Sequence, residues 1–83
     1  MINKTLEKVI RQWKDEAGVN EPIRFRYTFT LEDKILIIIY CARPGLMIGY
    51  KGQLIDKYRQ LIQSNFTCHE IEIQFEEVDT LWA

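Results

Sequence analysis

Hydrophobic side chains recur along the chain with two different periods, and each period predicts a different kind of element. In residues 3–17 they return every three or four positions, which is the spacing of one helix face. The members of that face are Leu6, Val9, Ile10, Trp13 and Ala17. Asn3 is the expected N-cap of this helix, and Gly18 is the expected residue just after its end.

Strict alternation of apolar and polar side chains predicts two half-buried strands, over residues 23–31 and residues 69–78. The apolar sets are Ile23, Phe25, Tyr27, Phe29 and Leu31 in the first and Ile71, Ile73 and Phe75 in the second. Residues 35–41 are apolar at every position, which predicts a central strand covered on both faces.

The polar faces of the two alternating strands carry opposite charges. Arg24 and Arg26 lie on the first, and Glu70 and Glu72 lie on the last. We expect ion pairs between these arginines and glutamates across a shared sheet face.

Two helices are predicted between the second and third strands. Pro44 suits the first turn of a short helix that ends near Ile48. Residues 53–64 then place apolar side chains on one helical face, at Leu54, Ile55, Tyr58, Leu61 and Ile62. The predicted fold is therefore α+β with the order α-β-β-α-α-β. Its three-stranded mixed sheet has two parallel strands, joined by a crossover, and helices on one face.

Length and composition limit the function classes. A chain of 83 residues makes one domain, residues 1–83, and 47% hydrophobic residues are enough for a core. Two cysteines do not make a disulfide framework, so Cys41 and Cys68 are expected to be structural thiols in a reducing compartment. No signal peptide is visible, and the longest apolar run is far shorter than the roughly 20 residues that span a bilayer. A soluble cytoplasmic protein without a membrane partner is expected.

The net charge of −1 argues against a protein that binds nucleic acid through bulk positive charge. The charges are unevenly spread, however. Residues 43–59 hold an excess of cations, with Arg43, Lys51, Lys57 and Arg59 against Asp56, whereas the charges of residues 70–79 are all acidic. Only the first of these segments is suited to attract phosphate.

A Gly-x-x-Gly run, residues 49–52, lies between the two predicted helices. Glycine has no Cβ, so a phosphate backbone can approach the main chain closely. The run leads into the first turn of the second helix, where free N–H groups and the helix dipole favour an anion. Lys51 adds a positive charge at the tip, and Ile48, Leu54 or Ile55 offers an apolar wall for splayed bases.

The run Ala42-Arg43-Pro44-Gly45, followed by aliphatic residues and then Gly-x-x-Gly, closely resembles the signature of a type II KH domain. It is most similar to the KH domain of the third small-subunit ribosomal protein, and the predicted element order matches the type II arrangement. The resemblance implies an RNA-binding module, associated with the ribosome or with RNA processing, that grips about four nucleotides of a single strand. The partner expected is single-stranded RNA, with single-stranded DNA as the alternative.

The predicted nucleic-acid-binding residues are Arg43, Ile48, Gly49, Tyr50, Lys51, Gly52, Gln53, Ile55 and Lys57. Arg43 has two open interpretations, contact with a phosphate or support of the strand–helix junction. The ribosomal relatives usually have two basic residues at the tip, whereas this chain has Tyr50 and Lys51. If three cations meet phosphates, the salt slope for a single strand is about −2, which predicts weak, micromolar binding.

Catalytic and metal sites find no support. Cys68 and His69 are neighbours, but a metal site needs three or four ligands. His69 is also the only histidine, and residues 45–51 are one residue short of a P-loop and lack its Ser or Thr. We expect no enzyme activity and no cofactor.

Two alternatives to RNA binding remain. One is a KH-fold protein-interaction domain with little RNA affinity, which binds a protein partner or a second copy of itself through the sheet surface. The other is a helix-turn-helix that reads duplex DNA with the helix after Gly52. The short helix that begins at Pro44 and the acidic composition of the chain disfavour it.

Overall fold

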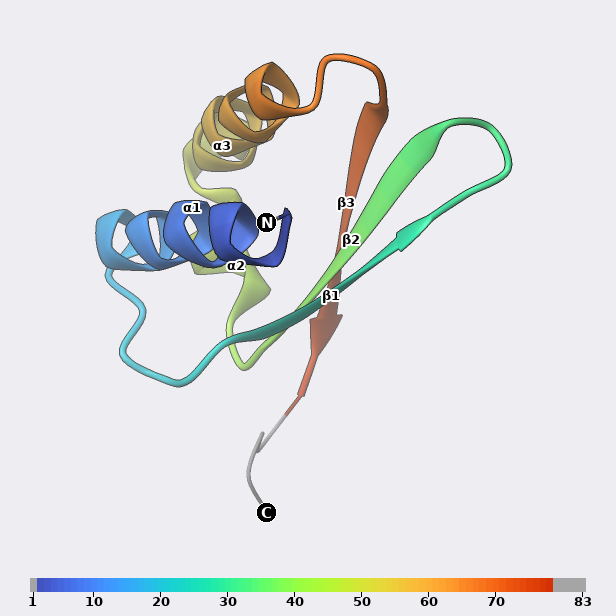
Figure 1. Ribbon diagram of the computed structural model, residues 1–83. Coiled ribbons are helices and arrows are strands. Elements are labelled where there is room, and N and C mark those ends of the chain that lie inside the picture. Colours follow the sequence, from blue (N-terminus) through green and yellow to red (C-terminus); the bar gives the residue numbers. More distant parts are fainter. Residues whose placement is uncertain (1, 79–83) are drawn as a thin grey trace.

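The computed structural model describes residues 2–78, and its elements follow the predicted order (Figure 1). They are α1 (Ile2–Ala17), β1 (Arg24–Phe29), β2 (Lys34–Cys41), α2 (Pro44–Ile48), a 3₁₀ turn η1 (Tyr50–Gly52), α3 (Gln53–Asn65) and β3 (Glu70–Glu77). Helix α1 already begins at Ile2, so Asn3 lies inside it and the expected N-cap was wrong. Gly18 has a φ of 74°, as expected of the residue that follows a helix. Trp82 lies outside the described residues.

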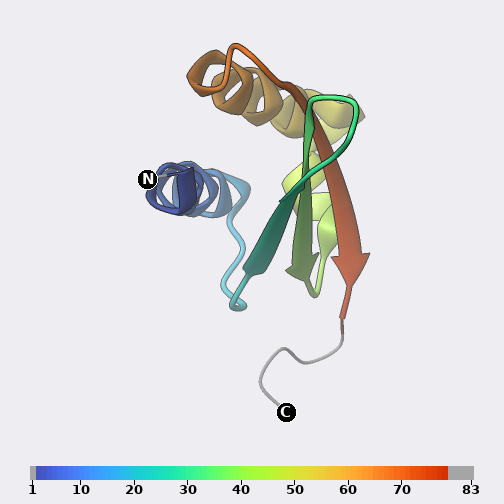
Figure 2. The ribbon, with the colours of Figure 1, turned by 45° about the vertical axis from the view of Figure 1, so that its right-hand side comes forward.

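The three strands form one mixed sheet in the order β1-β2-β3. β1 and β2 are antiparallel, and β2 and β3 are parallel. β2 is therefore the central strand, which explains why its sequence is apolar throughout. The three helices lie on the same side of the sheet (Figures 1 and 2), so the predicted α+β architecture is confirmed.

The core lies between the helices and one face of the sheet. α1 packs against α2 and α3, while α2 and α3 pack against β3. Alternate residues of β2 supply the centre of the core, because successive side chains of a strand point to opposite faces. Its buried members are Leu6, Val9, Ile10, Trp13, Val19, Ile35, Ile37, Ile39, Cys41, Met47, Tyr58, Ile62 and Ile71.

The end of β1 departs from the predicted pattern. Phe29 is 55% exposed and Leu31 is fully exposed, although both were expected on the inner face. β1 ends at Phe29, and the β1–β2 turn lies at the corner of the sheet farthest from α1 (Figure 1). Periodicity therefore identified the strand correctly, but it cannot show how far the helices extend over it. Cys68 is exposed too, so only the buried Cys41 is a structural thiol, and both are free.

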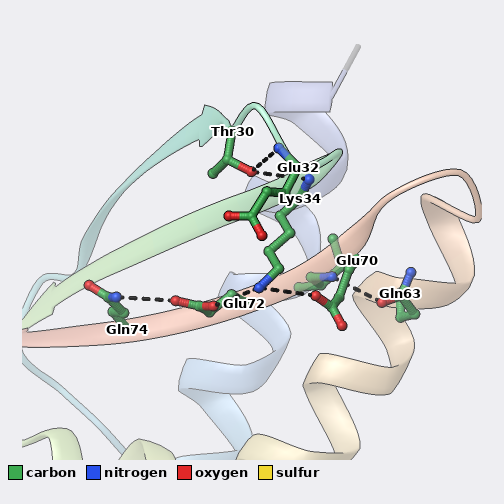
Figure 3. A network of polar contacts seen from close by, with 8 residues as sticks. Thr30, Glu32, Lys34, Gln63, Glu70, Glu72 and Gln74 are labelled. Carbon is green, nitrogen blue, oxygen red and sulfur yellow. Dashed lines mark hydrogen bonds and ion pairs between the residues drawn. The ribbon is translucent and has the colours of Figure 1, made fainter.

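The expected pairing of arginines with glutamates was also wrong, because β2 separates the two strands. Glu70 and Glu72 instead pair with Lys34 of β2, at Nζ–O distances of 3.3 and 3.8 Å (Figure 3). Gln63 of α3 fixes the start of β3, since its side-chain oxygen accepts a 3.0 Å hydrogen bond from the backbone N–H of Ile71.

Candidate nucleic-acid interface

The loop between α2 and α3 has a backbone that ordinary residues rarely adopt. Gly49 has φ 80° and ψ 177°, and Gly52 has φ 76° and ψ 16°. Lys51 between them also has a positive φ, of 53°. The loop is closed by backbone hydrogen bonds from the Gly49 N–H to the Gly45 carbonyl and from the Gly52 N–H to the Gly49 carbonyl, at 3.0 and 3.1 Å. The chain therefore reverses sharply and projects residues 50 and 51 outward.

The two glycines are required for different reasons. A Cβ on Gly49 would lie 2.9 Å from both Cβ and Cγ of Leu54, which is closer than real contacts allow. The backbone of Gly49 also falls in a region that only glycine occupies readily. A Cβ on Gly52 would meet only Ile55, at an ordinary 3.8 Å, so its conformation alone favours glycine there.

The tip of the loop is open to solvent. Tyr50 is 74% exposed, and the Lys51 ammonium lies 5.4 Å from the centre of its ring. Gly52 is the N-cap of α3 and has no side chain that caps the helix. The exposed Gln53 begins that helix. A cation, an aromatic face and a helix N-terminus therefore meet at one place, which is chemistry that suits a phosphate with an adjoining base.

A buried hydrogen bond holds α2 just before the loop. The indole Nε1–H of Trp13 donates to the carbonyl of Met47 over 2.8 Å. The same indole stacks on the ring of Tyr58 in α3, with ring centres 5.3 Å apart and planes 10° apart. Trp13 thus contacts the helices on both sides of the loop and fixes their relative position.

Arg43, at the junction of β2 and α2, is engaged by a carboxylate. Its Nε and Nη2 donate to the two oxygens of Glu21 over 3.3 and 2.7 Å. The hydrogen bond from Arg43 holds the pKa of Glu21 below its ordinary value, so this carboxylate is charged at neutral pH. Of the two interpretations of Arg43, this geometry favours support of the strand–helix junction.

Lys57 is paired in a similar way. Its ammonium lies 2.7 Å from the carboxylate of Glu16 in α1, and the hydroxyl of Tyr58 donates to the same oxygen. The hydrogen bonds from Lys57 and then Tyr58 lower the pKa of Glu16. Burial, followed by the hydrogen bond to Glu16, raises the pKa of Tyr58 to about 12. Within residues 2–78, Lys51 is thus the one cation among the predicted site residues that has no carboxylate partner.

Comparison with known proteins agrees with this architecture. A family model described as KH domain matches residues 1–83. The chain belongs to the KH domain family. Its order α-β-β-α-α-β is the type II arrangement.

Relatives of this KH domain carry the name small ribosomal subunit protein uS3. The protein from Thermosipho africanus is 33% identical over 81 residues, which cover 93% of this chain and 37% of the relative. The protein from Sulfurihydrogenibium sp. is 29% identical over 73 residues, which cover 88% of this chain and 30% of the relative. The KH domain therefore spans only about a third of the length of these two relatives.

The structure of the KH domain brings most of the predicted site residues together around the α2–α3 turn. Gly49, Tyr50, Lys51 and Gly52 form the turn, Gln53 follows it, and Ile48 and Ile55 are half-buried on either side. Arg43 directly precedes α2 and Lys57 lies on α3, the two helices that flank the turn, but their charges are directed to Glu21 and Glu16.

Three further residues of the KH domain shape this site and were not predicted as part of it. Trp13 was assigned to the core, which is correct, but its hydrogen bond to α2 was missed. Glu16 lies one helical turn after Trp13, so the periodicity of α1 was a signal that it borders the core. Glu21 lies in the α1–β1 connection, and nothing in the local sequence marked it.

Among residues 2–78, no group of three His, Cys, Asp or Glu side chains is placed to hold a metal ion. None of the helices described has the length and apolar character needed to cross a bilayer.

Proposed function

We propose that this KH domain binds a short single strand of RNA at residues 49–52. The observation that carries the proposal is the conformation of that turn. It combines two glycines at positive φ, an exposed Tyr50–Lys51 tip and the start of a 13-residue helix that no side chain caps. A Gly-x-x-Gly turn of this kind clamps about four backbone nucleotides in KH domains.

Each member of the proposed site has a separate task. Gly49 and Gly52 let the phosphate backbone approach the main chain. Gln53 lies at the helix N-terminus, where the helix dipole attracts a phosphate. Lys51 contributes the charge, and Tyr50 offers a ring on which a base stacks. Ile48 and Ile55 line the adjoining groove floor, and Arg43 and Lys57 act as outer cations that have to leave their carboxylates to reach a phosphate.

The ion pairs lower the expected affinity. A strand held by Lys51 alone has a salt slope of about −0.7, whereas recruitment of Arg43 and Lys57 as well raises the magnitude to about 2. We therefore propose weak, micromolar binding, which becomes tighter only when a second contact is added. A single strand of DNA offers the same phosphates and bases, so the preference for RNA depends on contacts to the 2′-hydroxyl.

We propose a ribosomal or RNA-processing role in the cytoplasm, and the relatives named as proteins of the small ribosomal subunit support the ribosomal form of it. We propose that the domain acts there through binding, without catalysis and without a cofactor. We also propose that residues 1–83 act as one KH domain. The protein-interaction alternative rests on the open sheet face and does not require the loop.

The test is fluorescence anisotropy with labelled short RNA pools at low salt. Wild type should bind, and Tyr50→Asp/Lys51→Asp should lose binding while its circular dichroism stays unchanged. The matched control is Gln12→Asp/Lys8→Asp, which makes the same charge change on exposed positions of α1. If both double variants bind equally weakly, net charge explains the loss and the loop proposal fails. If wild type itself does not bind, the fold serves another purpose.

A further inference from the structure

The sheet face turned away from the helices carries three columns of different chemistry. The pairing register places Arg24 beside Tyr40 and Arg26 beside Ile38 on one side of the central strand. On its other side, the register places Glu72 beside Leu36, Gln74 beside Ile38 and Glu76 beside Tyr40. The face is thus basic along β1, apolar along β2 and acidic along β3.

The outer charges of this face are only partly neutralised within the chain. Lys34 pairs with Glu70 and Glu72, as Figure 3 shows. Among the residues described, Arg24, Arg26 and Glu76 make no ion pair. β2 lies between them, and two strand spacings of about 4.8 Å keep β1 and β3 side chains apart. These charges therefore remain available to a partner.

The middle column supplies the apolar part of the face. Leu36, Ile38 and Tyr40 are only partly buried, although they belong to the most hydrophobic strand of the chain. Sheet faces bury such side chains when they pack on another sheet at about 10 Å. An apolar stripe between two charged columns gives such a contact both a driving force and a direction.

We propose that this face binds the same face of a second copy of the chain. Two sheets can face each other about a twofold axis that runs either along the strands or across them. The axis along the strands reverses left and right, so the basic column of each copy lies over the acidic column of the other. The axis across the strands places arginines over arginines. The charges therefore select a dimer in which the two central β2 strands face each other and run in the same direction, while β1 of each copy lies over β3 of the other.

The register also names the contacts of this dimer. Arg24 of each copy lies opposite Glu76 of the other copy, and the two Ile38 side chains meet at the axis. Because of the twofold symmetry, the Arg24–Glu76 contact forms twice in the dimer. Three short strands form a small face compared with standard interfaces, so the dimer is weak. The Gly-x-x-Gly turn is on the helix side and stays open, so the dimer does not depend on the proposed RNA binding.

The test measures the mass of the isolated domain by sedimentation equilibrium from about 10 µM to about 1 mM, the range of weak association. The mass should rise from one chain toward two, and the Ile38 methyl signals should shift over the same range. Arg24→Glu and Glu76→Arg should each raise the dissociation constant about tenfold. The double variant Arg24→Glu/Glu76→Arg should restore association, because it exchanges the two columns at that contact.

Matched controls separate the contact from net charge. Lys8→Glu and Glu7→Lys make the same charge changes at exposed positions of α1 and should leave the dimer unaffected. Circular dichroism establishes that each variant is folded. A wild type that stays monomeric at the highest concentration overturns the proposal. The proposal also fails if neither Arg24→Glu nor Glu76→Arg weakens the dimer. It fails as well if the double variant associates no better than the two single variants.

Discussion

Arg43 and Glu21 are joined by two hydrogen bonds across 22 positions of sequence. The planar guanidinium presents a fork that suits either a carboxylate or a phosphate, and here a carboxylate of the same chain occupies it. The hydrogen bond from Arg43 lowers the pKa of Glu21, so this carboxylate carries its charge at neutral pH. If the proposed RNA site extends to Arg43, Glu21 competes with a phosphate for its guanidinium.

Removal of this competition should strengthen RNA binding. Glu21→Gln keeps the size of the side chain but loses its charge, which leaves Arg43 free to meet a phosphate. We expect several-fold tighter binding at low salt and a salt slope that is steeper by about 0.7, the value of one additional phosphate contact. Anisotropy titrations at four or more salt concentrations measure both quantities.

The control for this change is Glu7→Gln, which removes one negative charge from an exposed position of α1. It should alter affinity only slightly and leave the slope unchanged. Equal effects of the two variants would mean that Glu21 acts through net charge and that Arg43 never reaches the RNA.

The two glycines of the turn should differ in their effect on stability. Gly49→Ala places a Cβ 2.9 Å from the Leu54 side chain in a backbone region nearly closed to other residues, so we expect a loss of about 3 kcal/mol or more. At Gly52 a Cβ meets no close contact, so Gly52→Ala should lose only the about 1 kcal/mol that a left-handed backbone costs a residue with a Cβ. Urea denaturation of both variants measures the difference. Equal losses would show that the turn relaxes around the new Cβ of Gly49.

The sequence was most informative where structure depends on local chemistry. The α2–α3 turn was predicted from its glycines and its neighbours, because positive φ values and helix ends are properties of a few adjacent residues. The central position of β2 followed from its continuous apolar run. These features needed no knowledge of how distant segments pack.

The features of the candidate site that were missed depend on how α1 and the connection after it pack against the rest of the chain. Glu16 and Lys57 are 41 positions apart and meet only because α1 lies against α3. Glu21 reaches Arg43 from the connection between α1 and β1. The exposure of Phe29 likewise reflects where the helical layer stops. A charge pattern shows which cations are present, but only the tertiary structure shows which are already paired.

Trp13 should support the loop as well as the core. Trp13→Phe keeps an aromatic ring but leaves the buried Met47 carbonyl without its donor, and a smaller ring adds a cavity. We expect a loss of about 2–4 kcal/mol in the free energy of unfolding. Amide hydrogen exchange should also show faster opening at Gly49, whose N–H bonds to the Gly45 carbonyl within α2. If Trp13→Phe speeds amide exchange at Gly49 no more than at Ile37 in the core strand, Trp13 contributes only packing and does not support the loop.

Ionisation of Tyr58 should lower the free energy of unfolding at high pH, and substitution of Tyr58 should remove this pH dependence. Its pKa is raised to about 12 by burial and by the hydrogen bond to Glu16, against about 10 in the unfolded chain. The folded state therefore holds this proton more tightly. The resulting stabilisation is complete below pH 10 and is lost as the pH rises toward 12, at up to about 1.4 kcal/mol per pH unit.

Tyr58→Phe isolates this contribution from the other groups that titrate in the same range. The difference in unfolding free energy between wild type and variant, measured by urea denaturation at several pH values, should be constant from pH 7 to about 9.5 and then shrink toward pH 12. Absorbance titration of the folded protein should show one phenol near pH 12 that the variant lacks. A difference independent of pH would mean that Tyr58 ionises equally in both states, and that its contact with Glu16 does not hold in solution.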